Sequence, residues 1–279
     1  NKVQSKDDVA KATQTPIVGE ISHNEESDNL IVANSSRSAI SEQFRALRTN
    51  LSFFFKDQGS KVFLLTSSMS GEGKSFVALN LGNILALSNK KVLLMELDLR
   101  KPGLSVKLGM KNDFGFTNYI IDSSLTAEQI IQPLKIHKNI SLMSSGPIPP
   151  NPAEMLLNER TSNLIRQLKT TYDYIIIDAP PVGLVTDAQL LSDHADFCMY
   201  LVRQNHTFKQ QINIVEDLRA NQKMKDLGIV VNDIKANNGY GYGYGYGYGY
   251  GYGYGYGNYG SEHKKQATWL GKLKRRIKL

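Results

Sequence analysis

The sequence SMSGEGKS, from Ser68 to Ser75, constrains the fold more than any other feature of this chain. It follows the apolar run KVFLLT at 61–66 and precedes an amphipathic segment near 75–88, which predicts a strand, a loop and a helix in succession. Gly71 and Gly73 allow the loop backbone to approach a phosphate closely, and the helix start offers free N–H groups. The motif therefore predicts a nucleotide-binding P-loop, although Ser68 replaces its usual first glycine.

Two side chains of this loop have predicted roles of their own. Lys74 is expected to reach the β- and γ-phosphates, and the Ser75 hydroxyl is expected to ligate Mg²⁺. The residues expected to contact the nucleotide here are Ser70, Gly71, Glu72, Gly73, Lys74, Ser75 and Phe76.

A second motif, DYIIIDAPP, places Asp178 at the end of an isoleucine-rich strand. In a parallel sheet, that end lies beside the P-loop. A carboxylate there holds Mg²⁺ directly or through water. Asp178 is therefore a predicted catalytic and metal-binding residue, with a helix-capping aspartate as the alternative.

A third motif, KVLLMELDLRKPG, places Glu96, Asp98 and Arg100 after another apolar strand. Their spacing of two puts them on one side of an extended chain. Two carboxylates and a guanidinium suit Mg²⁺, phosphate and a hydroxyl proton. We expect Asp98 to help hold Mg²⁺, Arg100 to contact the nucleotide, and either Glu96 or Asp98 to act as the base. The alternative is a solvated strand end before the turn at Pro102.

The remaining apolar runs set the predicted fold class. Strands are expected at 61–66, 91–97, 140–145, 173–179, 196–202 and 227–232, and helices near 75–88, 153–169, 186–194 and 207–221. Continuous apolar strands alternating with helices indicate a mainly parallel, doubly wound α/β sheet. No NKxD-type sequence for reading guanine follows the late strands, which favours ATP over GTP. Asn232 is expected either to contact the base or to occupy a simple turn.

The chain divides into zones of different composition. Residues 1–34 are polar and are expected to form a linker that touches the fold weakly, and 35–57 is expected to be a helix with Ser41 as a possible N-cap. The folded domain is predicted over 35–238. Residues 239–260 are almost pure Gly-Tyr and are expected to be disordered. Residues 261–279 resemble a basic amphipathic helix.

The net charge of +7 does not indicate nucleic-acid binding by the folded domain. Residues from Gly239 onward carry seven cations and one acid, a net charge of +6. The preceding residues hold 26 basic and 25 acidic groups and are nearly neutral. Cys198 is the single cysteine, which excludes an intrachain disulfide or a cysteine-built zinc site. Because the chain opens on Asn1 rather than Met, we expect a fragment of a longer protein. No apolar stretch approaches the ~20 residues of a membrane-spanning helix.

The three motifs together resemble the cytoplasmic domain of the bacterial tyrosine kinases, or BY-kinases. The family's Walker A, A′ and B motifs are similar to 68–75, 92–100 and 174–181. The sequence EQFRALR resembles the family's ExxRxxR helix through Glu42, Arg45 and Arg48. The first acid of the A′ motif is Glu96 where the family has aspartate. The upstream DDVAKATQTPIVGEI resembles the stretch that follows a transmembrane helix in these proteins.

This resemblance implies a Min/Par-like P-loop fold and an ATP- and Mg²⁺-dependent protein-tyrosine kinase. It implies a ring of identical subunits, closed by the ExxRxxR helix, that phosphorylates tyrosines between neighbours. It also implies the cytoplasmic domain of a bacterial inner-membrane protein that regulates polysaccharide polymerisation and export, with an upstream transmembrane region and an opposing tyrosine phosphatase. The expected phosphorylation sites are Tyr240, Tyr242, Tyr244, Tyr246, Tyr248, Tyr250, Tyr252, Tyr254, Tyr256 and Tyr259.

Two alternatives belong to other functional classes. A Min/Par-type partitioning ATPase shares the fold, but its signature lysine position is Met69 here, and it does not explain ten tyrosines. A nucleotide-sensing scaffold that self-associates through tyrosine stacking explains the Gly-Tyr tract but not the acidic motifs.

Overall fold

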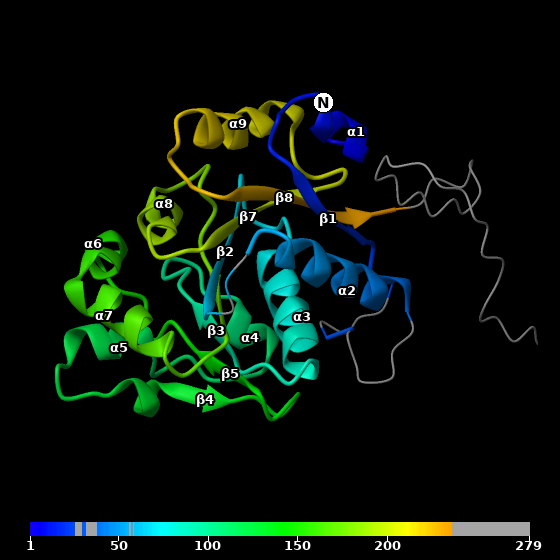
Figure 1. The fold of residues 1–279 in the computed structure, drawn as a ribbon. Helices are drawn as coiled ribbons and strands as arrows, with labels where there is room; N and C mark the ends of the chain where they lie inside the picture. Colours follow the sequence, from blue (N-terminus) through cyan, green and yellow to red (C-terminus); the bar gives the residue numbers. More distant parts are fainter. Residues whose placement is uncertain (26–29, 32–37, 56, 58, 236–279) are drawn as a thin grey trace, which may run out of the picture. The chain divides into compact units, whose positions relative to one another are not determined.

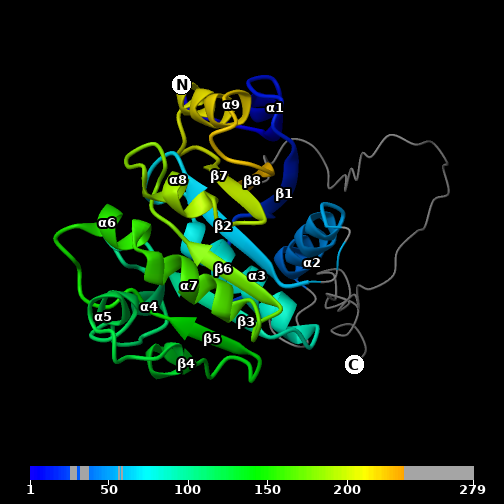
Figure 2. The same ribbon diagram turned by 60° about the vertical axis from the view of Figure 1, so that its left-hand side comes forward.

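The protein is described here by a computed structural model that covers residues 1–25, 30–31, 38–55, 57 and 59–235. Its centre is one sheet with the strand order β1-β8-β7-β2-β6-β3-β5-β4 (Figures 1 and 2). Every neighbouring pair is parallel except β4 with β5. The predicted doubly wound α/β class is confirmed. Residues 239–260, expected to be disordered, and residues 261–279, expected to form a basic amphipathic helix, lie outside the described residues.

The bounds of the elements follow the apolar pattern closely. The strands are β1 Ile17–Ser22, β2 Lys61–Ser67, β3 Val92–Glu96, β4 Ile131–Pro133, β5 Ile140–Met143, β6 Tyr174–Asp178, β7 Phe197–Arg203 and β8 Leu227–Ile234. The helices are α1 Lys6–Ala10, α2 Ala39–Ser52, α3 Lys74–Leu87, α4 Leu104–Lys107, α5 Phe116–Ile121, α6 Pro152–Leu157, α7 Glu159–Leu168, α8 Asp187–Ser192 and α9 Ile212–Ala220, with 3₁₀ turns η1 Ala127–Ile130 and η2 Lys209–Gln211.

Alternate residues of each strand point to opposite faces of the sheet, which gives the domain two cores. Val62 and Leu64 of β2 belong to the core that α5 to α9 cover, whereas Phe63 and Leu65 belong to the core under α2 and α3. Figure 1 shows α2 and α3 on one side of the strands. The strands are apolar on both faces because helices cover both, as the sequence predicted.

The N-terminal residues correct one expectation. We expected 1–34 to touch the fold weakly, but 17–22 form strand β1, which pairs in parallel with β8. Val3, Val9 and Ile21 are completely buried. These few apolar residues are too scattered for a periodic signal, and the strand forms because it covers the edge of β8.

Helix boundaries differ in two places. The N-cap of α2 is Ser38, whose hydroxyl accepts the backbone N–H of Ser41, so Ser41 is not the cap. The helix expected over 153–169 is two helices, because Asn158 leaves the helical conformation and caps α7. Among the described residues, no helix is long and apolar enough to cross a membrane.

Candidate active site

The carboxyl ends of three central strands bring the predicted motifs together. In the sheet register, Asp178 of β6 lies opposite Leu65 of β2 on one side and Glu96 of β3 on the other. The P-loop follows β2 directly, and Asp98 follows β3 by two residues. The strand order therefore assembles one site from segments that are about a hundred residues apart in sequence.

The P-loop has the backbone conformation that a phosphate cradle needs. Gly71 and Gly73 have φ angles of +86° and +101°, in the region where other residues are strained. A Cβ atom on Gly73 would lie 2.0 Å from Asn232 Nδ2, so no larger residue fits. Gly73 also supplies no capping side chain to α3. The first N–H groups of this 14-residue helix are therefore available to a phosphate.

Lys74, Ser75 and Asp178 converge beneath this loop. Lys74 is 8% exposed, and its Nζ lies 3.4 Å from the Ser67 hydroxyl. The Ser75 side chain lies close enough to the Asp178 carboxylate to lower its pKa. Burial raises the pKa of Asp178 to about 6, although Lys74 and Ser75 act in the opposite direction.

Asp178 also meets the requirement for a cation site. Its Oδ1 is completely buried and has no hydrogen-bond partner within the described part of the chain. A buried carboxylate oxygen without a partner destabilises the folded state unless a cation or a bound water interacts with it. No group of three or more His, Cys, Asp or Glu side chains suited to a metal occurs among these residues. Phosphate and water oxygens would therefore supply most ligands of a Mg²⁺ ion held by Ser75 and Asp178.

Glu96 is held by main-chain hydrogen bonds at the end of β3. It is fully buried, and its Oε1 accepts the backbone N–H groups of Leu104 at 2.6 Å and Ser105 at 3.0 Å. Its Oε2 accepts the N–H of Ser145 at 3.3 Å. Both oxygens are thus occupied in joining β3 to α4 and to the segment after β5. These three main-chain donors make Glu96 less suited than Asp98 to the predicted role of base.

Asp98 is the second carboxylate of the A′ motif. Its Oδ1 accepts the N–H of Lys101 at 3.0 Å. Burial raises the pKa of Asp98, with a smaller opposing effect from Lys74. A carboxylate with a raised pKa is a better proton acceptor. Burial also lowers the pKa of Lys107, which lies near enough to Asp178 and Lys74 to interact with their charges.

Arg100 forms a forked ion pair with Asp187. Its Nε lies 2.8 Å from Oδ2 and its Nη2 lies 3.0 Å from Oδ1. Asp187 is completely buried in the first turn of α8, whereas the Arg100 side chain is 43% exposed. This pair joins the segment after β3 to α8, so the guanidinium predicted to contact the nucleotide is held in place by a carboxylate.

Glu72 and Asn232 support the P-loop from behind. The buried Glu72 carboxylate accepts the Ser68 hydroxyl at 2.7 Å, the Met69 N–H at 2.8 Å and the Thr207 hydroxyl. Asn232 Nδ2 donates to the Glu72 carbonyl at 3.0 Å. The side chains of both predicted nucleotide ligands therefore hold the loop backbone in this structure.

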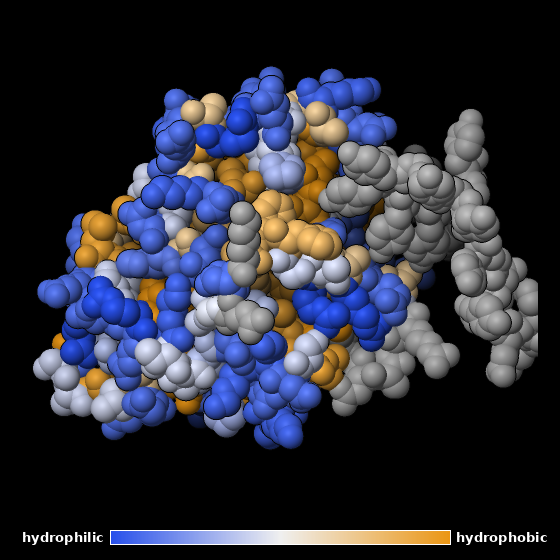
Figure 3. Space-filling model, viewed as in Figure 1, coloured by the Kyte–Doolittle hydropathy of each residue, from blue (hydrophilic) through white to orange (hydrophobic). Residues whose placement is uncertain are grey.

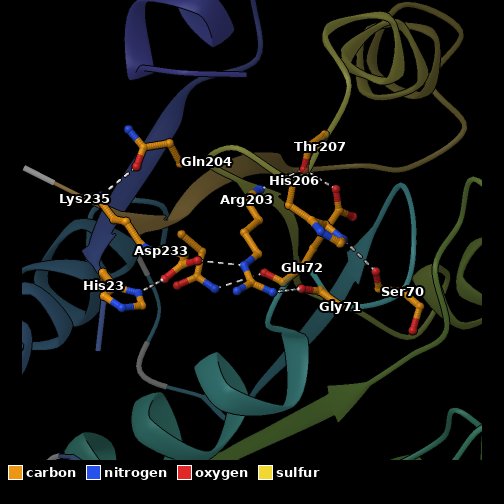
Figure 4. A network of polar contacts seen from close by, with 11 residues as sticks. His23, Ser70, Gly71, Glu72, Arg203, Gln204, His206, Thr207, Asp233 and Lys235 are labelled. Carbon is orange, nitrogen blue, oxygen red and sulfur yellow. Dashed lines mark hydrogen bonds and ion pairs between the residues drawn. The ribbon is translucent and has the colours of Figure 1, made fainter. Parts of the chain in front are cut away.

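The segment after β7 adds contacts that sequence reasoning missed (Figure 4). Arg203 Nη1 donates to the Gly71 carbonyl at 2.8 Å, and His206 Nε2 lies 3.0 Å from the Ser70 carbonyl. Arg203 Nε also reaches Asp233 at 2.8 Å. Arg203 is the last residue of β7. Isolated Arg and His residues carry no periodic signal, so only the fold reveals them.

The N-terminal residues contact this same segment. The N–H of Val3 donates to the Thr207 carbonyl, and that of Asn205 to the Val3 carbonyl, both at 2.8 Å. At the end of β1, His23 Nδ1 lies 2.5 Å from Asp233 Oδ1. Residues far from the P-loop in sequence are thereby linked to it through one layer of polar contacts.

The remaining predicted residues lie on α2 and at the start of α3. Glu42 and Arg45 form an ion pair of 2.5 Å on α2, and Arg48 Nη1 donates to Ser88. The Phe76 ring packs edge-on against Phe44, with centroids 6.0 Å apart. Phe76 thus joins α3 to α2.

Comparison with known proteins agrees with this geometry. Residues 63–242 match the family described as the CobQ/CobB/MinD/ParA nucleotide binding domain. The fold and the site therefore define a P-loop nucleotide-binding protein of this class.

Comparison with individual relatives identifies a more specific family within this nucleotide-binding class. The tyrosine-protein kinase YwqD of Bacillus subtilis is 37% identical over 207 residues, 74% of this chain and 86% of that protein. The tyrosine-protein kinase wzc of Salmonella typhi is 32% identical over 75% of this chain and 29% of its own length. The crystal structure of the chimerical protein CapA2B2 aligns with a TM-score of 0.74 and 33% identity, covering 82% of this chain and 98% of that one. The chain belongs to the bacterial tyrosine kinase family.

Proposed function

We propose that this chain is an ATP-dependent protein-tyrosine kinase that phosphorylates its own Gly-Tyr segment, residues 239–260. The single observation that carries this proposal is the joint placement of Asp98, Asp178 and the P-loop at one sheet edge. The relatives that carry the same name support it. Both acidic groups have pKa values raised by burial, which suits a site that works on a cation and a proton.

In the proposed mechanism, the first N–H groups of α3 and the Lys74 ammonium hold the phosphates. Ser75, Asp178 and Asp98 are the residues that would hold Mg²⁺, which supplies charge neutralisation to the phosphates when bound. A tyrosine oxygen attacks the γ-phosphorus, and the bond to the β-phosphate oxygen breaks. Asp98 accepts the phenolic proton as the new P–O bond forms. Most of the rate enhancement comes from positioning.

The Gly-Tyr segment suits an intermolecular acceptor. It holds ten of the fourteen tyrosines, and its glycines let each one enter a narrow site. A tethered acceptor has a high effective concentration. We place transfer between neighbouring subunits of a ring, with Glu42, Arg45 and Arg48 of α2 at the subunit contact. This part of the proposal rests on the family resemblance.

The proposed cellular role also follows from that resemblance. The chain would act as the cytoplasmic domain of an inner-membrane protein, joined to an upstream transmembrane region, and would regulate capsule or exopolysaccharide polymerisation and export. A tyrosine phosphatase would reverse the modification. Nucleic acid has no place in this scheme, since the folded domain is nearly neutral.

The test is mass measurement of phosphatase-treated protein before and after incubation with Mg²⁺-ATP, with Lys74→Met as the control variant. We expect successive gains of phosphate that map to Tyr240–Tyr259 and are absent from the variant. ATP hydrolysis without a gain of mass would instead support the partitioning ATPase. Nucleotide binding without either reaction would support the scaffold.

A further inference from the structure

A groove opens on the surface next to the active site and is not used by the proposed mechanism. It encloses about 460 Å³ between α5, the proline-rich segment 147–151 and α6. Its walls are mostly apolar, and the rim carries the amides of Asn118, Asn151 and Asn158 and the carboxylate of Glu154. In Figure 3, hydrophobic residues reach the surface at the left of the molecule, where Figure 1 places α6.

The apolar walls of the groove are open to solvent within the described part of the chain. Ile121 is 76% exposed and Ile148 is 66% exposed. Both lie in the groove, one on the α5 side and one in the proline-rich segment. Two large β-branched side chains exposed in one concave surface indicate a surface that binds another chain.

The groove is built on rigid supports. The N–H groups of Phe116 and Thr117, at the start of α5, each donate to a carbonyl at the end of β5, at 2.9 Å. Asn112 holds Gly146 through its side chain, with hydrogen bonds of 2.9 and 3.0 Å. The groove is therefore preformed, so the protein that carries it loses little conformational freedom when it is occupied.

Its position relative to the transfer site follows from the sheet. The proline-rich wall of the groove begins two residues after Ser145, whose N–H donates to Glu96 Oε2 at 3.3 Å. Strands β5, β3 and β6 are consecutive in the sheet, so the end of β5 lies about 10 Å from that of β6 and Asp178. The Glu154 carboxylate at the rim also lies near enough to Arg100 of the A′ motif for their charges to attract each other.

We propose that this groove docks the Gly-Tyr segment, residues 239–260, of a second copy of the chain. The inference rests on the proposed kinase function and names the surface that holds its acceptor. The occupant bears no charge between Gly239 and Gly260, which suits apolar walls that carry a single carboxylate at the rim. The cationic residues 261–279 lack this match.

The repeat of the segment fits the distance to be covered. In an extended chain, alternate residues point to the same side, so nearly all these tyrosines share one face. They recur about every 6.6 Å along the strand. A tyrosine held in the groove is therefore followed by further tyrosines at regular intervals, which extend toward the transfer site. Every shift by two residues presents an equivalent arrangement, so the groove holds the segment while successive tyrosines reach the site.

Glu154 gives this docking a preference for unmodified tyrosine. A phosphotyrosine carries roughly −1.5 to −2 charges at neutral pH. Beside the Glu154 carboxylate it is repelled, whereas the neutral phenol is not. Phosphorylated repeats therefore leave the groove, and unmodified repeats replace them.

The first test measures binding without ATP, so it does not depend on catalysis. The probe is a fluorescent peptide that copies residues 240–250, with a Gly-Ser repeat as its control. We expect binding to the parent, and about tenfold or greater weakening by Ile121→Asp or Ile148→Asp. Leu157→Asp is the matched control, since Leu157 is 65% exposed on α6 and does not line the groove. Equal affinity in all four proteins would overturn the proposal.

The second test uses mixed subunits. An isotope-labelled Lys74→Met chain serves as acceptor, and an active chain serves as donor. We expect Ile148→Asp to lower phosphate transfer about tenfold when it is in the donor, and to have no effect in the acceptor. An effect in the acceptor alone, or in neither chain, would overturn the docking proposal while phosphotyrosine still forms. Absence of phosphotyrosine from every mixture would instead overturn the kinase function.

Discussion

Glu96 and Asp178 are direct neighbours in the register of β3 and β6, yet their carboxylates have opposite surroundings. The two oxygens of Glu96 accept three main-chain N–H groups. Asp178 Oδ1 is buried without a partner in the described residues. One carboxylate therefore stabilises the fold, and the other is held ready for a ligand.

The first prediction concerns Asp178 and pH. Its pKa is raised from 3.8 to about 6, so the folded state disfavours the ionised form, and stability falls as the pH rises through this range. At pH 8, Asp178→Asn should stabilise the nucleotide-free protein by on the order of 3 kcal/mol. The variant should melt roughly 5–10 °C higher, and the gain should vanish near pH 4.

Thermal melts at both pH values measure this effect. With Mg²⁺-ADP present, the parent should gain stability and Asp178→Asn should not. A variant that melts like the parent at pH 8 would show that the buried carboxylate is already satisfied.

The second prediction separates the two acids of the A′ motif. Glu96→Gln replaces one accepting oxygen by an NH₂ group that cannot accept the main-chain N–H groups around it. We therefore expect a loss of about 1–3 kcal/mol in the free energy of unfolding. Because we propose Asp98 rather than Glu96 as the base, the folded variant should keep phosphotransfer within about tenfold. Asp98→Asn should not lower stability, because burial raises the pKa of Asp98 and disfavours its charged form. It should reduce the rate by about 10²–10⁴. Urea denaturation and single-turnover phosphorylation measure the two quantities.

The third prediction concerns the contacts behind the P-loop. Arg203→Ala removes the hydrogen bond to the Gly71 carbonyl and the pair with Asp233. We expect ATP to bind about tenfold more weakly, as the loss of one charged hydrogen bond predicts. Arg219→Ala, which breaks only the pair with Glu216 on α9, is the matched control. Titration with a fluorescent ATP analogue measures both, and equal affinities would rule out a role for Arg203.

The fourth prediction concerns Gly73. Alanine there places a Cβ 2.0 Å from Asn232 Nδ2 and adopts a φ of +101°. Gly73→Ala should therefore abolish detectable ATP binding. Asn232→Ala in the same chain relieves the contact but leaves the backbone strain, so the double variant should recover binding only in part. Calorimetric titration of the parent and the two variants tests this order.

The fifth prediction tests the subunit contact proposed for α2. Changing Arg45 and Arg48 to alanine should shift the protein from a large oligomer to a monomer in light scattering. Gln43→Ala is a control on the same helix, since its side chain contacts Ser22 of β1. Unchanged mass in the double variant would place the contact elsewhere.

Much of this molecule follows from its amino-acid pattern, and particular residues explain why. The six predicted strands form because β-branched and aliphatic runs such as YIII at 174–177 bury both faces. The P-loop and Asp178 follow from spacing alone. Short elements such as β4 and α4 escape notice because three or four residues show no period.

The sequence proposes which residues form the candidate site, but it does not predict all of their contacts. The sequence places Glu96 beside Asp98, yet only the folded chain brings Leu104 and Ser145 to its carboxylate. Similarly, Asp187 is adjacent to Arg100 only through the packing of α8. Contacts between distant segments depend on tertiary structure, which a single sequence does not encode as a local pattern.

Strand β1 has a consequence for how this domain can be cut or fused to other proteins. Removing residues 17–22 would leave β8 with a row of free main-chain donors and acceptors along its outer side. Such an exposed strand edge pairs with strands of other polypeptides and promotes aggregation. A shortened version that starts at α2 should therefore precipitate. The N-terminal residues keep the domain soluble by covering the edge of β8.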